Sequence, residues 1–125
     1  MTTTALPIAG TPATLVRADN PGPMTLDGTN TWIVHDPQAS SAVVIDPGPD
    51  DDAHRAAVRR TLADRRLDVE VVLLTHGHAD HSGGAQRFAA GVGAPLRALD
   101  AAWGPRTLAA DEAFRAGGLD WQVLA

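Results

Sequence analysis

Short runs of apolar, mostly β-branched residues alternate along the chain with turn-forming segments, and this pattern predicts short strands. Residues 13–19 (ATLVRAD) are expected to form a first strand, after a loose lead-in over residues 1–12. The segments TWIVHD and SAVVIDPG, joined by the turn DPQASS, are expected to form a strand pair. The run AVVI is apolar at every position, which predicts a strand that is covered on both faces.

The second part of the pattern alternates helices with strands. A helix is expected after the second strand of the pair, with aspartates at 50–52 before it and arginines at 65–66 at its end, as the helix dipole favours. Residues 69–75 (VEVVLLT) predict another buried strand, GAQRFAAGVG a short helix, and APLRALD a third strand. This order predicts βαβ units and therefore a sheet with parallel pairs.

The C-terminal segment EAFRAGGLDWQVLA contains two strand-like pieces around Gly117 and Gly118, which predicts a hairpin. Between the first and second strands, NPGPMTLDGTN is too rich in Pro, Gly, Asn and Asp for a regular element and predicts a shaped loop. A length of 125 residues allows one domain at most.

Composition narrows the chemistry. Hydrophobic residues make up 44% and charged residues 20% of the chain, as in globular proteins. There is no Cys, so any metal ligands must be His, Asp or Glu. The net charge is -5 and all ten basic residues are Arg, which argues against a broad nucleic-acid surface. The sequence has neither a signal-peptide pattern nor an apolar run of membrane-spanning length, so a cytoplasmic location without a membrane partner is expected.

Candidate chemistry is concentrated in THGHADHSGG, directly after the strand predicted at 69–75. His76, His78, Asp80 and His81 place four ligand-type side chains within six residues, in a chain with 5 His in total. Spacing of two directs side chains of an extended backbone to one side, so His76 and His78 can face a common point. Imidazoles and a carboxylate are the ligands that zinc takes when thiolates are absent. The alternative is a polar loop with incidental histidines.

This segment resembles the His-x-His-x-Asp-His signature of the metallo-β-lactamase superfamily. VVIDPG resembles that family's strand ending in Asp-x-Gly, and NPGPMTLDGTNTWIV resembles the opening of its lactamase-like hydrolase branch, which also includes an endoribonuclease. The resemblance covers residues 13–125. It implies that His76 and His78 bind a first zinc ion, that Asp80 and His81 bind a second, and that Asp80 also orients the nucleophile.

The resemblance further implies that Asp46 holds the ligand loop without binding the metal; a plain turn residue is the alternative. Two zinc ions are implied per complete site, with Mn or Fe as other options. Asn30 and Thr31 are expected to pack at a strand edge, with a place on the rim of the site as the alternative. His35 and His54 are interpreted as ordinary surface or core residues.

The fold class implied is α/β, half of a four-layer αββα sandwich: one mixed sheet with helices on its outer face. Residues 1–125 are thus expected to form a single incomplete domain, the N-terminal half. Its inner sheet face is expected to be bare, awaiting a missing C-terminal half or self-association. In the family, a third His, a bridging Asp and another His complete the site downstream, whereas this sequence has no His after His81.

The function implied is metal-dependent hydrolysis of a small-molecule ester, thioester or lactam, or of RNA. Because each metal would keep two ligands here, the 125-residue chain alone is expected to be inactive. A non-catalytic metal-binding or interaction module is the alternative, and a non-functional remnant is a third hypothesis.

Overall fold

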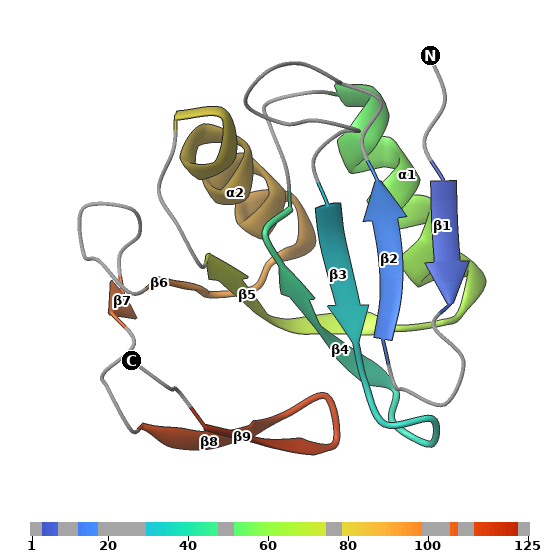
Figure 1. Cartoon of the computed structure of the whole chain (residues 1–125), viewed down its shortest axis with the longest axis vertical. Helices are drawn as coiled ribbons and strands as arrows, with labels where there is room; N and C mark the ends of the chain where they lie inside the picture. The colour runs from blue at the N-terminus through green and yellow to red at the C-terminus, as the bar shows by residue number, and fades with distance from the viewer. Residues whose placement is uncertain are drawn as a thin grey trace.

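The computed structural model describes residues 4–7, 13–17, 30–47, 52–74, 79–98, 106–107 and 112–122. They form a seven-stranded sheet, two helices and a two-stranded hairpin (Figure 1). The strands are β1 (Thr4–Pro7), β2 (Ala13–Arg17), β3 (Asn30–Val34), β4 (Ser41–Ile45), β5 (Asp68–Leu74), β6 (Leu96–Ala98), β7 (Arg106–Thr107), β8 (Ala113–Ala116) and β9 (Leu119–Gln122), and the helices are α1 (Asp52–Asp64) and α2 (Ala79–Val92).

The large sheet is mixed, and its strands follow chain order from β1 to β7. The pairs from β1 to β4 are antiparallel, and those from β4 to β7 are parallel. The two helices connect parallel strands, α1 between β4 and β5 and α2 between β5 and β6, so the predicted βαβ units are confirmed. Because β4, β5 and β6 are parallel, their carboxyl ends meet at one edge of the sheet, where ligands collect in α/β folds.

Two short strands were not expected from the sequence. The lead-in over residues 1–12 contains β1, which pairs with β2 from Thr4 opposite Arg17 to Pro7 opposite Thr14. β7 pairs with the end of β6. Both strands lie at the edges of the sheet, where Pro and short strands are tolerated and the apolar pattern is weak. β1 and β7 therefore form strands because they pair with β2 and β6, not because of their own residue pattern.

The helices pack on one face of the sheet and enclose the larger part of the core. Val58 and Leu62 of α1 are buried, as their helical spacing predicts, and Phe88 of α2 is 1% exposed. α1 ends at Asp64, one residue before the two arginines expected at its end. No helix among the described residues is long and apolar enough to cross a membrane. The buried members of this core are Val16, Ile33, Ala42, Val44, Val58, Leu62, Leu67, Val72, Leu74, Ala85, Phe88, Ala89, Leu96 and Ala98.

The opposite face of the sheet is not bare, contrary to expectation. The β8–β9 hairpin packs on it, and Val43, Val71 and Leu73 are buried in a second cluster with Ala116 of the hairpin. Phe114 and Trp121 pack against this cluster and stack on each other, with ring centroids 6.0 Å apart. The prediction of a bare face is therefore wrong for the centre of the sheet, because the C-terminal segment folds back over β4 and β5.

β4 is covered on both faces, as its uniformly apolar run predicts. Ala42 and Val44 belong to the helix-side core, whereas Val43 belongs to the hairpin-side cluster, and all three are fully buried. Trp32 of β3, which pairs with Ile45 of β4, is only half-buried. Trp103 lies outside the described residues. The sheet is thus closed in the middle and more open beside β3.

The hairpin turn is held to the sheet by polar contacts. Gly117 and Gly118 both have positive φ, 61° and 76°, as a two-residue turn of this kind requires. The backbone amide of Asp36 donates to the carbonyl of Gly117 at 2.7 Å, and the amide of Gly117 donates to the Glu70 carboxylate at 3.2 Å. The predicted hairpin is confirmed, and its turn lies against the β3–β4 connection.

Candidate metal site

The predicted ligand segment runs from the connection after β5, which ends at Leu74, into the first turn of α2, which begins at Ala79. His76 and His78 fall outside the described residues. Asp80 and His81 lie in α2, where the structure describes their backbone but not their side chains. The sequence predicted a loop up to Gly84, whereas the helix already begins at Ala79. The assignment of all four side chains as metal ligands stays a prediction.

Asp46, the residue predicted to hold the ligand segment, directly follows strand β4. It is buried and has a positive φ of 52°. Its backbone amide donates to the carbonyl of Leu73 at 2.9 Å, which ties the end of β4 to the last residues of β5. Asp46 therefore lies at the carboxyl edge of the parallel strands, next to the strand that leads into His76. Its role in holding the ligand loop remains a prediction.

Two buried residues, Thr31 and His54, form hydrogen bonds that connect to the backbone of Asp46. The Thr31 hydroxyl donates to the carbonyl of Asp46 at 2.7 Å, and its Oγ1 lies 2.8 Å from Nε2 of His54. Thr31 is fully buried and His54 is 1% exposed. Thr31 is therefore buried in the core, and the choice between a packing role and a role at the site stays a prediction. His54 is likewise a core residue, although its polar contact was not anticipated.

The other described histidine, His35, lies in the connection between β3 and β4. Nδ1 of His35 lies 2.8 Å from the carbonyl of Asp36 and donates to it, since a carbonyl only accepts. This local contact accounts for His35 as a structural residue, as expected. In the part of the chain that the structure describes, no three His, Asp or Glu side chains gather as a metal site would require.

Zinc fits the donor set that the sequence places at this edge. Three imidazoles and a carboxylate follow the C-terminal end of a buried strand, and zinc accepts such nitrogen and oxygen ligands. The described neighbours supply a rigid frame for them, because the end of β4 and the end of β5 are hydrogen-bonded to each other. Backbone that is fixed in this way can hold ligands at a defined separation.

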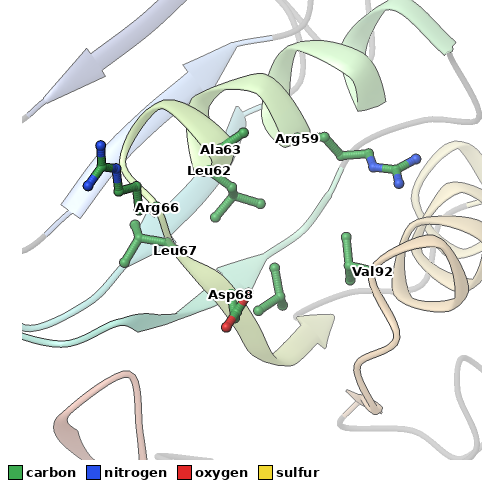
Figure 2. Close-up of a pocket in the computed structure, with 8 residues that line it drawn as sticks. Arg59, Leu62, Ala63, Arg66, Leu67, Asp68 and Val92 are labelled. Atoms are coloured by element: carbon green, nitrogen blue, oxygen red, sulfur yellow. The ribbon is translucent and has the colours of Figure 1, made fainter.

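A depression of about 440 Å³ lies at the other end of β5 (Figure 2). Leu62, Ala63, Leu67 and Val92 make its apolar lining, and Arg59, Arg66 and Asp68 add charged groups at its margin. The α1–β5 turn and the C-terminal end of α2 form its walls. It carries a single acidic side chain and no histidine, so it lacks the groups that metal-dependent hydrolysis needs. The candidate site is therefore at the carboxyl edge of the sheet and not here.

Comparisons with known proteins identify the family to which the sequence is similar. The sequence profile of the metallo-beta-lactamase superfamily matches residues 24–118. Two fungal relatives are the thioesterase pkgB of Emericella nidulans, 43% identical over 65 residues, and the atrochrysone carboxyl ACP thioesterase dmxR1 of a Cryptosporiopsis species, 42% identical over 69 residues. These alignments cover 52% and 55% of this chain but 18% and 21% of the relatives, so the chain spans about a fifth of their length.

A solved structure supports the fold as well. The metallo-beta-lactamase from Pontibacter korlensis superposes with a TM-score of 0.73 at 21% identity, over 95% of this chain and 58% of that protein. At this identity the likeness bears on the fold alone. The expected architecture, part of a larger sandwich with a mixed sheet and helices on one face, is confirmed.

Proposed function

Because the chain belongs to the metallo-beta-lactamase superfamily, we propose that it carries the first half of the metal site of a zinc-dependent hydrolase that cleaves thioesters. The observation that supports this most directly is the position of the segment from His76 to His81. In sequence it follows β5, whose carboxyl end is hydrogen-bonded to the buried Asp46. An active site in an open α/β sheet is expected at the carboxyl edge of its parallel strands.

The relatives support a thioester substrate over the other options. The two proteins that are 42–43% identical to this chain are both named thioesterases. An RNA substrate is less favoured by the charge of the chain, since its net charge is -5.

Bound zinc would acidify a water molecule and withdraw electrons from the thioester carbonyl. In the proposed reaction this chain supplies four groups. His76 and His78 would hold one ion, His81 would help to hold the other, and Asp80 would both bind metal and orient the attacking oxygen. Hydrolysis would form a bond between the water oxygen and the acyl carbon and break the carbon–sulfur bond, and a proton from the water would pass to the departing thiolate. The positive N-terminal end of α2 would favour the developing negative charge.

The ligand set within these residues is incomplete under this proposal. No His follows His81 in the sequence, so each zinc ion would keep two ligands from this chain, whereas catalytic zinc takes three from protein. We therefore expect weak zinc binding and no appreciable turnover by the 125-residue chain. Turnover is expected when a further segment supplies the remaining histidines and the bridging aspartate.

The test measures zinc binding by the purified chain through competition with a chelating dye. A thioester assay is run on the same samples. His78→Ala should abolish binding at the first ion, because His76 alone would remain there, and lower the total zinc bound. His35→Ala is the matched control, since His35 contacts only its own turn among the contacts described, and should bind zinc as wild type does. Absence of zinc binding by the folded wild-type chain would reject the proposal.

Two other outcomes have distinct meanings. Two tightly held zinc ions per chain would show that the site is complete and that ligands were overlooked. Retained metal with no turnover after the downstream segment is joined would instead favour a non-catalytic metal-binding module, the second candidate function.

A further inference from the structure

A buried chain of hydrogen bonds connects α1, β3 and the end of β4. It runs from the His54 ring to the Thr31 hydroxyl, and from that hydroxyl to the backbone carbonyl of Asp46. The two distances are 2.8 and 2.7 Å, and all three residues are buried. Polar groups buried at such a place are costly unless they are satisfied, so this arrangement is specified by the sequence.

The direction of each hydrogen bond follows from the chemistry of its members. A hydroxyl has one proton, and the carbonyl of Asp46 can only accept, so Thr31 gives its proton to Asp46. Oγ1 of Thr31 must then accept from His54, which requires a proton on Nε2. Both hydrogen bonds therefore run in one direction: His54 donates to Thr31, and Thr31 donates to Asp46 at the end of β4.

The backbone of Asp46 is held in a conformation that residues other than glycine seldom adopt. Its φ of 52° lies in the left-handed region, which is unfavourable for residues with a Cβ and persists where neighbours enforce it. Two contacts enforce it here. Thr31 holds the carbonyl of Asp46, and the carbonyl of Leu73 accepts from its amide. The backbone of Asp46 is thus fixed on both sides, and one side is fixed by a side chain.

We propose that Thr31 and His54 are positioning residues for the metal site. By fixing the backbone of Asp46, they set its position against Leu73, three residues before His76. This role rests on the proposed function, since it assumes that Asp46 holds the metal-ligand segment. Neither residue touches the reacting atoms; both act through Asp46. Changing the hydroxyl of Thr31 should therefore alter metal affinity without changing any ligand.

The chain offers a matched pair of substitutions. Thr31→Val keeps the shape of the side chain and removes the hydroxyl, whereas Thr31→Ser keeps the hydroxyl. Thr61→Val is the control, because the Thr61 hydroxyl also donates to a backbone carbonyl, that of Ala57 at 2.9 Å, but within α1 and without contact to Asp46. Both valine variants lose one hydroxyl-to-carbonyl hydrogen bond, and only one of them loses it at Asp46.

Two measurements are made on each variant of the full 125-residue chain. Zinc affinity is measured by competition with a chelating dye, and the amide resonances of residues 75–81 are followed by NMR without metal. Supporting groups around metal ligands typically change affinity by about 10–100-fold, so Thr31→Val should weaken zinc binding by about tenfold. Thr31→Ser should restore it, and Thr61→Val should leave it unchanged. The amide resonances should move in Thr31→Val alone.

The outcomes separate this inference from the proposed function. If the folded wild-type chain binds no zinc, the proposed function fails, and the amide resonances still decide whether Thr31 positions the segment. Wild-type resonances and wild-type zinc affinity in Thr31→Val would overturn the inference. Should Thr31→Val not fold, His54→Leu is measured in its place: it removes the donor to Thr31, so zinc binding should weaken and the amide resonances should move, and wild-type values of both would overturn the inference.

Discussion

Phe88 anchors α2 to the sheet, and its removal gives the largest stability change that we predict. The ring is 1% exposed and is the largest fully buried side chain among the residues that the structure describes. Losing its transfer free energy costs about 2–3 kcal/mol. If about 60 Å³ of the vacated space stays unfilled, the cavity adds about 1.5 kcal/mol. Phe88→Ala should therefore lower the free energy of unfolding by about 4 kcal/mol.

This loss is large for a chain of this size. Domains are stable by about 5–15 kcal/mol, so Phe88→Ala would remove a substantial share of the total. With a urea slope of about 1.5 kcal/mol per M, the unfolding midpoint should fall by about 2.5 M. The assay is urea unfolding followed by far-ultraviolet circular dichroism. At the low end of the stability range, about 1 kcal/mol would remain, and roughly one molecule in six would be unfolded without urea.

A neighbouring substitution on the same helix serves as the control. Gln86 is exposed, and Gln86→Ala should change the free energy of unfolding by less than about 0.5 kcal/mol. The reasoning is refuted if both variants unfold at the wild-type urea concentration, since α2 would then be held by something other than the Phe88 ring. An intermediate variant, Phe88→Leu, should fall between the two because it refills part of the cavity.

Two further predictions concern the hairpin. Gly118→Ala should destabilise the chain more than Gly93→Ala: both glycines have positive φ, but a Cβ on Gly118 would lie 2.9 Å from Cβ of Asp36, whereas one on Gly93 meets nothing within 4 Å. Thermal melts should give a loss of about 1–2 kcal/mol for Gly93→Ala and a larger one for Gly118→Ala, and equal losses would contradict the packing of the turn on the sheet. Trp121→Phe keeps an aromatic ring beside Phe114 but loses the indole hydrogen bond to the carbonyl of Ala116, 2.9 Å long. It should cost about 1 kcal/mol in the same melts, and an unchanged melting temperature would show that this bond contributes nothing.

The strands that are buried on both faces could be predicted from the sequence. β4 and β5 have long apolar runs because each side of the sheet is covered, by the helices and by the hairpin. β1 and β7 could not be predicted, since their pairing depends on distant strands and their own residues carry a weak pattern. The coverage of the second face was missed for a related reason: it depends on where the hairpin folds back.

The start of α2 shows how tertiary packing overrides local preference. Gly83 and Gly84 each disfavour a helix by about 1 kcal/mol, so the sequence predicted a loop there. The helix nevertheless extends back to Ala79, and Ala85 and Phe88 bury its inner face against the sheet. Burial of this kind outweighs two unfavourable residues.

The candidate site divides in the same way. Its ligand-type residues are adjacent in sequence, and their spacing and resemblance to a known signature made them recognisable. The support behind them was not recognisable, because Thr31 and His54 are 23 positions apart and meet only in the folded chain. A threonine in a strand and a histidine in a helix carry no local signal for such a contact.

The left-handed backbone of Asp46 has a consequence for how this position can change over evolutionary time. Glycine, asparagine and aspartate are the residues that enter this region of backbone space most readily. Of these three, aspartate alone carries an ionised carboxylate. A lineage that drifts to glycine or asparagine here keeps the bend but gives up the charge, and one that drifts to glutamate keeps the charge but strains the bend. If the Asp46 carboxylate holds the metal-ligand segment, as proposed, backbone shape and side-chain charge together leave aspartate as the residue that satisfies both demands at position 46.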